Sequence, residues 1–262
     1  MPIFFIPIGS TISKIQVSGN TTSKSATGST NNLTVSSVTP NASGKNGITV
    51  TVKFGTGGTK DYTYTYNVTP PAVNNFKVTA SNVVSGTGTS GDPYVIACRK
   101  TTTLTVSGNK ASTDANSSLY AKFGNNTYSS TLTKNLTPNS TKQSVQVKAK
   151  YYNSKDDLSG AETTTQTIYY RAQTFAVNIT SSGNGTVYPS GTQQVGATPV
   201  SITATPNLGS AFKQWEVTDG AKVADATNAS TTLTATAAGT VKAIFEEKPA
   251  TTIYLEPTGH WN

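Results

Sequence analysis

The alternation of apolar and polar residues is the feature that most restricts how this chain can fold. Residues 48–54 read Ile-Thr-Val-Thr-Val-Lys-Phe, and residues 61–66 place a tyrosine at every second position. The same period returns in four more segments, at residues 104–106, 145–147, 200–204 and 241–245. Successive side chains of a strand point to opposite faces, so this period is typical of sheets with one buried and one wet face. The sequence therefore predicts an all-β protein, with residues 221–229 as the best place for a short helical turn.

The composition indicates thin sheets rather than one thick core. Ser and Thr supply about 29% of the residues, whereas hydrophobic residues supply 34% and charged residues 12%. Both of the latter fractions are low for a globular protein, and Thr favours strands whose outer face is wet. Such a chain of 262 residues is expected to form several small domains in a row, each with a modest core.

An internal repeat divides the first two thirds of the chain. The tetrapeptide Val-Ser-Gly-Asn at residues 17–20 recurs at 106–109, and Thr-Pro-Asn at 39–41 recurs at 137–139. Each copy continues with an alternating strand and then a Tyr/Thr-rich strand, at residues 50–54 and 62–66 in the first copy and 145–151 and 165–170 in the second. Short strands with regularly spaced turns predict Ig-like sandwiches at residues 1–71 and 72–172, with Pro70 and Pro71 at the boundary.

The two copies differ at their beginnings. The second copy opens with a strand predicted at residues 76–80, and the first copy has no counterpart to it. The first domain is therefore expected to lack one strand and to leave one sheet edge open.

Residues 173–248 follow a different pattern. Four glycines, at 183, 185, 191 and 196, precede a strand predicted at 200–206, and Gly209, Phe212 and Trp215 follow it. Further strands are predicted at 232–234 and 241–245. This order resembles the divergent internalin-type B repeat of bacterial surface proteins. The resemblance implies a compact β-rich module that occurs in tandem on exposed proteins, without catalysis. We expect its core to contain Phe175, Ile202, Phe212, Trp215, Leu233 and Phe245. Residues 249–262 look like a linker followed by the opening strand of a further module.

Catalytic and metal-binding residue types are scarce. His260 is the only histidine, Cys98 is the only cysteine, and twelve acidic residues are spread along the chain. The chain has too few histidines and cysteines to form a nucleophile–base pair or a zinc site. No glycine run matches a phosphate-binding loop. Loop oxygens near Asp92, or near Asp156 and Asp157, offer a calcium site, but solvated turn aspartates are the preferred interpretation. The chain is therefore predicted to be no enzyme and to use no cofactor.

The net charge of +8 comes almost entirely from lysine, since Arg99 and Arg171 are the only arginines. Nucleic-acid readers usually gather arginines, so we predict no nucleic-acid partner. The densest lysines, at 148, 150 and 155, are interpreted as a solvated surface, with binding to an anionic surface or polymer as the alternative.

Tyrosines suggest a second alternative function, the stacking of sugar rings. They lie at residues 62, 64 and 66, at 151–152 and at 169–170. The preferred interpretation is that these rings fill one face of a sandwich, with their hydroxyls at its rim. Trp215 is expected in a core, and Trp261 is the best exposed candidate for a sugar contact.

Residues 1–8 are apolar but too short to span a membrane, and they lack a basic segment, so we predict neither a signal peptide nor a membrane span. The candidate partner-binding residues of this segment are Ile3, Phe4, Phe5, Ile6 and Ile8. We expect them, or the neighbouring open edge, to pair with a partner subunit of a capsid, tail or cell-surface assembly by strand addition. The alternative is that residues 1–8 pair only within their own sheet.

These features predict a non-catalytic structural or attachment protein displayed outside a particle or cell. The modules belong outside cells, whereas the chain begins at Met1 without a signal, and this favours a phage virion fibre or decoration protein, released by lysis. The alternatives are a bacterial cell-surface adhesin or stalk, or a carbohydrate-binding accessory module. A glycan at the distal end is a further expected partner.

Overall fold

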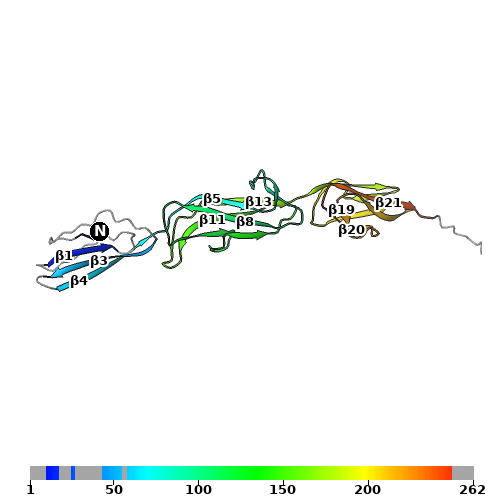
Figure 1. The fold of residues 1–262 in the computed structure, drawn as a ribbon. Coiled ribbons are helices and arrows are strands. Elements are labelled where there is room, and N and C mark those ends of the chain that lie inside the picture. Colours follow the sequence, from blue (N-terminus) through cyan, green and yellow to red (C-terminus); the bar gives the residue numbers. More distant parts are fainter. Residues whose placement is uncertain (1–9, 18–24, 27–42, 55–57, 250–262) are drawn as a thin grey trace, which may run out of the picture. The chain divides into compact units, whose positions relative to one another are not determined.

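The computed structural model describes residues 10–17, 25–26, 43–54 and 58–249 (Figure 1). All elements within these ranges are β-strands, and no helix occurs among them. The all-β prediction is confirmed. The helical turn predicted at residues 221–229 is wrong, because Ala221 and Val223 bury their side chains in β19 (Ala221–Val223) and pair with β20 (Ser230–Ala235).

The chain divides into two compact units. One comprises Met1–Ala80, Thr103–Asn135 and Ser144–Ile168, and the other comprises Ser81–Thr102, Leu136–Gln143 and Tyr169–Asn262. The division of the first part of the chain at residues 71 and 72 stays a prediction.

The first sheet has the order β2-β1-β3-β4 and is antiparallel throughout (blue in Figure 1). Its strands are β1 (Ser10–Val17), β2 (Ser25–Ala26), β3 (Gly44–Phe54) and β4 (Gly58–Val68). The β3–β4 ladder runs from Gly44 opposite Val68 to Phe54 opposite Gly58. Both strands carry the alternation of apolar and polar residues that the sequence showed, and this is why they pair over their whole length.

The next two sheets form the Ig-like sandwich. The second sheet has the order β10-β8-β5, from β5 (Val73–Ala80), β8 (Thr102–Lys110) and β10 (Thr133–Leu136). The third has the order β12-β11-β13-β7-β6, with β9 (Ser118–Phe123) also paired to β11 (Gln143–Asn153). Its remaining strands are β6 (Val83–Ser85), β7 (Tyr94–Ile96), β12 (Leu158–Ser159) and β13 (Gln166–Ala172).

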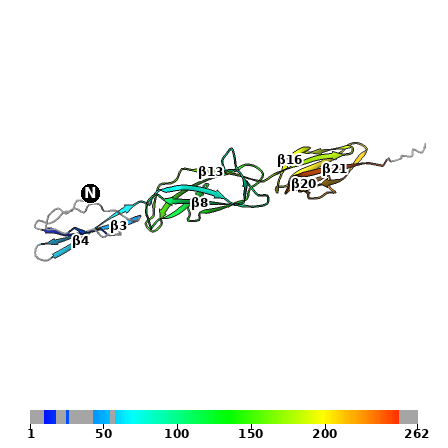
Figure 2. The same ribbon diagram turned by 45° about the horizontal axis from the view of Figure 1, so that its top comes forward.

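Buried apolar side chains cover the inner faces of these two sheets. The second sheet contributes Val78, Leu104 and Val106, and the third contributes Ile96, Ala121, Phe123, Val147, Ala149, Tyr151, Ile168 and Tyr170. The hydroxyl of Tyr151 on β11 donates to the carbonyl oxygen of Gly108 on β8 at 3.1 Å, which links the third sheet to the second. Figure 2 labels one strand of each of these sheets, β8 and β13. A buried tyrosine thus satisfies its polar end at the edge of the core.

The internal repeat corresponds to similar structure in only part of each copy. The predicted strand pairs recur, since β3 lies beside β4 in one copy and β11 lies beside β13 in the other. The two Val-Ser-Gly-Asn segments differ in the sheet to which they belong. Val17 ends β1, which shares a sheet with β3, whereas Val106 lies on β8, in a different sheet from β11. The first Thr-Pro-Asn segment lies outside the described residues.

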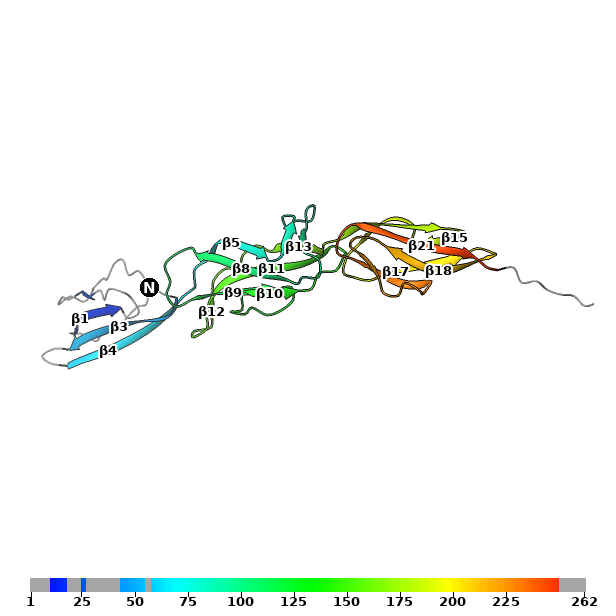
Figure 3. The same ribbon diagram turned by 45° about the vertical axis from the view of Figure 1, so that its right-hand side comes forward.

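The last eight strands form two four-stranded sheets around one core (Figure 3). The fourth sheet has the order β16-β14-β21-β18, from β14 (Phe175–Ser182), β16 (Gly191–Val195), β18 (Ser210–Val217) and β21 (Gly239–Glu247). The fifth has the order β15-β17-β20-β19 and adds β15 (Gly185–Tyr188) and β17 (Val200–Pro206).

The predicted core of this module is confirmed in its main members. Ile202, Trp215, Leu233 and Phe245 are all buried in one cluster, and Phe175 and Phe212 pack against it while partly buried. The indole Nε1 of Trp215 donates to the carbonyl oxygen of Asn228 at 3.0 Å. A glycine is required at position 183, where φ is +93° and a Cβ atom would lie 2.6 Å from the carbonyl oxygen of Phe245.

A buried carboxylate organises a polar cluster ahead of β3. Asp114 accepts hydrogen bonds at Oδ1 from the amides of Ser43 and Asn116, both at 3.0 Å, and at Oδ2 from the hydroxyl of Ser117. Asn153 Nδ2 donates to the carbonyl oxygen of Ser43 at 2.9 Å. Burial raises the pKa of Asp114, but these hydrogen bonds outweigh it and lower the pKa to about 2. The ionised carboxylate therefore ties residues 43, 116 and 117 together.

Candidate functional site

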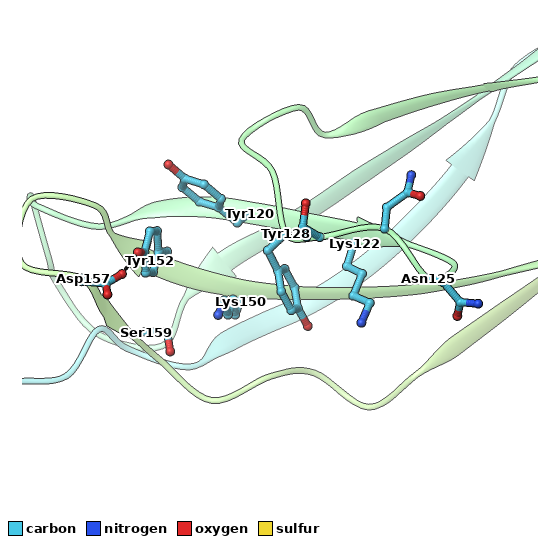
Figure 4. Close-up of a pocket in the computed structure, with 10 residues that line it drawn as sticks. Tyr120, Lys122, Asn125, Tyr128, Lys150, Tyr152, Asp157 and Ser159 are labelled. Carbon is cyan, nitrogen blue, oxygen red and sulfur yellow. Dashed lines mark hydrogen bonds between the residues drawn. The ribbon is translucent and has the colours of Figure 1, made fainter.

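A hollow of about 520 Å³ on the outer face of β9 and β11 is the candidate site (Figure 4). Three strands and two loops supply its lining. From β9 come Tyr120 and Lys122, and from β11 come Lys150 and Tyr152. The loop after β9 adds residues 125–128, the turn after β11 adds Asp157, and β12 adds Ser159.

The register of β9 and β11 places these side chains on the same face. Lys148 lies opposite Lys122, Lys150 opposite Tyr120, and Tyr152 opposite Ser118. The residues between them, among them Ala121 and Tyr151, are buried on the other face. Because side chains alternate along a strand, packing of the inner set presents the tyrosines and lysines outward.

The loop after β9 closes one side of the hollow. It turns at Gly124, whose φ is +61°, and comes back beside β9, where Ser129 and Ala121 exchange two backbone hydrogen bonds of 2.8 and 2.9 Å. This return places Tyr128 beside the lysine on β11, with Lys150 Nζ 4.5 Å from the centre of the Tyr128 ring. A cation at this distance from a ring face is attracted by it.

Two aromatic rings flank Lys150, and a third ring packs against one of them. Tyr120 and Tyr152 meet edge to face, with their centres 5.1 Å apart and their planes at 74°. Lys150 Nζ lies 5.4 Å from the centre of the Tyr152 ring, so it is situated between Tyr152 and Tyr128 (Figure 4). Edge-to-face and cation–ring contacts of this kind hold the rings in place before any ligand arrives.

Two carboxylates adjoin the tyrosines and lysines. The hydroxyl of Tyr152 donates to Asp157 Oδ1, and this hydrogen bond raises the pKa of Tyr152. Glu162 Oε2 accepts from Lys148 Nζ at 3.0 Å, which lowers the pKa of Glu162. Burial is the main cause that raises the pKa of Tyr128, and the nearby Glu162 carboxylate raises it further. Tyr128 and Tyr152 therefore stay protonated and Glu162 stays ionised at neutral pH.

The hollow includes only one of the tyrosines singled out from the sequence. Tyr152 lines it, whereas Tyr151 and Tyr170 are buried in the sandwich, as the preferred interpretation required. On β4, Tyr62 and Tyr66 are half-buried, and the Tyr66 hydroxyl is buried without a hydrogen-bond partner.

The remaining predicted positions lie elsewhere. Ile3, Phe4, Phe5, Ile6 and Ile8 lie outside the described residues, as do His260 and Trp261. The carbonyl oxygen of Asp92 accepts three loop amides, and Asp156 Oδ2 accepts from Asn153 Nδ2 at 3.3 Å. Among the described residues, no three His, Cys, Asp or Glu side chains gather as metal ligands would. Nor does any helix of the described part have the length and apolarity that crossing a membrane requires.

Sequence reasoning missed Tyr120, Tyr128 and Lys122. A signal for two of them was present, because Tyr-x-Lys at 120–122 has the same two-residue period as Lys-x-Lys-x-Tyr at 148–152. Tyr128 belongs to a loop and carries no such periodic signal.

Comparison with known families bears on the last module. Residues 175–249 match the divergent InlB B-repeat domain. This match confirms the resemblance predicted for residues 173–248. B-repeat domains are typical of bacterial surface proteins.

The chain was also compared with curated proteins and with solved structures. No curated protein matches the sequence. Among solved structures, the FN1–FN3 domains of chicken CNTN1 share 14% sequence identity over 88% of this chain and 78% of that one, with a TM-score of 0.25. A TM-score of this size carries no argument about function.

Proposed function

We propose that the chain is a non-catalytic attachment protein displayed on the outside of a particle or cell. The match of residues 175–249 to the B-repeat domain is the observation that carries this proposal. The proposal covers both settings considered from the sequence. On a phage virion the chain would be a fibre or decoration protein, and on a bacterial cell surface it would be an adhesin or stalk.

Electron microscopy with a gold-labelled antibody against the full chain tests the display. Label on intact, unpermeabilised cells or on purified particles supports the proposal. Label that appears only after cells are broken, and on no particle, contradicts it.

Attachment requires a contact to the carrier. The apolar side chains of Ile3, Phe4, Phe5, Ile6 and Ile8 are proposed to supply it by adding a strand to a partner subunit. Deletion of residues 1–8 should abolish assembly on the carrier. The B-repeat module should stay folded, which the buried emission of Trp215 reports. Assembly that survives the deletion refutes this contact.

Attachment also requires a contact to the outside, and the hollow on β9 and β11 is the second part of the proposal. Its tyrosine rings, amides and hydroxyls match the groups that carbohydrate ligands need, namely flat apolar surfaces and convergent polar partners. Replacing Tyr120 by alanine removes one ring from the hollow and leaves the buried face of β9 intact. The variant should bind carbohydrate more weakly than the unaltered chain on a glycan array.

A further inference from the structure

Lys122, which lines the hollow, belongs to an unbalanced pair of like charges. Lys122 and Lys148 lie directly opposite each other in the β9–β11 ladder, and like charges in that position destabilise a sheet. Glu162 forms an ion pair with Lys148 at 3.0 Å. Lys122 has no ion pair among the described residues, so its charge stays uncompensated at the wall of the hollow.

The other charges of the hollow are already engaged. Lys150 lies between the rings of Tyr128 and Tyr152, and Asp157 accepts the hydroxyl of Tyr152. The hollow thus holds two cations, of which Lys122 has no ion pair among the described residues, and one anion, Asp157, which accepts from a tyrosine. An anionic group placed beside Lys122 would offset the repulsion between Lys122 and Lys148.

The rest of the lining indicates which kind of anion fits. The paired rings of Tyr120 and Tyr152 supply aromatic surface to the hollow, and Asn125, Asn126 and Ser159 supply amide and hydroxyl groups. A sugar ring has one face of C–H groups that packs on an aromatic ring and a rim of hydroxyls that bonds to amides. A volume of about 520 Å³ lies within the range of pockets that enclose small ligands.

From these observations we infer that the hollow binds an acidic saccharide, with the sugar carboxylate at Lys122 and the sugar ring beside the Tyr120 and Tyr152 pair. The inference rests on the proposed attachment function, since it names the chemistry of the surface to which the chain attaches. Single-stranded nucleic acid also combines anions with stacking rings. The lining favours the saccharide because no arginine contributes to it, and nucleic-acid grooves track several nucleotides rather than ending in one hollow.

Paired probes test the inference on the full chain. A glycan array with acidic saccharides and their neutral counterparts comes first. Calorimetric titrations then compare tetragalacturonic acid with its methyl ester and 3′-sialyllactose with lactose, and they include a twelve-nucleotide oligo(dT). We expect at least one acidic saccharide to bind about tenfold more tightly than its neutral partner. Its affinity should fall as salt is added.

Matched variants locate the contact. Lys122→Met keeps the apolar stem and removes the charge, and it should weaken the acidic ligand about tenfold while leaving the neutral partner unchanged. Lys77→Met alters an exposed lysine of β5 outside the hollow, so it should change the affinity for neither the acidic nor the neutral ligand. Removing one of two opposed lysines relieves repulsion, so unfolding would not explain a loss of binding.

Three results would overturn the inference. They are equal binding of acidic and neutral partners, binding of no saccharide at all, and oligo(dT) binding that Lys122→Met abolishes. The first leaves the hollow as a neutral sugar site. None of the three bears on surface display, which the antibody labelling decides separately.

Discussion

Replacing Phe245 by alanine should destabilise the B-repeat module by more than any surface change within it. The Phe245 side chain is 6% exposed and meets Phe212 edge to face, with ring centres 6.1 Å apart. A Cβ atom at Gly185 would lie 2.5 Å from the Phe245 ring, so the ring packs directly on glycine backbone.

The packing sets the size of the effect. Deleting a buried phenylalanine side chain costs about 3–5 kcal/mol, and the cost is highest where the surroundings cannot collapse into the cavity. Glycine backbone at positions 183 and 185 has no side chain to move into that space. We therefore expect a loss of about 4 kcal/mol in the free energy of unfolding. With a urea dependence of about 1.5 kcal/mol per molar, the midpoint would fall by roughly 3 M.

Tryptophan fluorescence provides a local assay in the full chain. The protein has two tryptophans, Trp215 and Trp261, so a Trp261→Phe background leaves one reporter. Trp215 is 3% exposed and belongs to the same core as Phe245, so its emission shifts to the red when this module unfolds. Leu208→Ala is the matched control, because Leu208 is 100% exposed and its loss should change stability by less than about 0.5 kcal/mol. Equal urea midpoints for the two variants would refute the account of this core.

Three further outcomes follow from the described contacts. Because the folded-state pKa of Asp114 is lowered from 3.8 to about 2, its contribution of about 2 kcal/mol is complete above pH 4 and declines as the pH falls through about 2. Asp114→Asn should remove this pH dependence from denaturant unfolding curves. Gly183→Ala should destabilise the module by more than Gly191→Ala in the Trp215 assay, since both glycines have positive φ but only Gly183 faces a backbone carbonyl. In a spectrophotometric titration, Asp157→Asn should lower the raised pKa of Tyr152, and an unchanged titration curve would show that the Asp157 hydrogen bond is not its main cause.

The sequence by itself determined the class of the fold and the identity of the last module. Alternation with a period of two depends only on local chain geometry, so the strands at residues 48–54, 200–204 and 241–245 were predictable from residue order. The spaced glycines and aromatics of residues 173–248 were equally informative, because each glycine permits a turn or a close approach that other residues resist.

Tertiary structure decided which face of each strand is buried and which strands are neighbours. Tyr151 and Tyr152 are adjacent in the sequence, yet one is buried in the sandwich and the other lines the hollow. Alternation assigns them to opposite faces but does not say which face meets the second sheet. Likewise, Lys122 and Lys148 become opposed charges only through the register of β9 on β11. Tyr128 joins them because its loop folds back along β9. Pairing between segments that are distant in the chain depends on the packing of the whole sandwich. A local sequence pattern does not specify this packing.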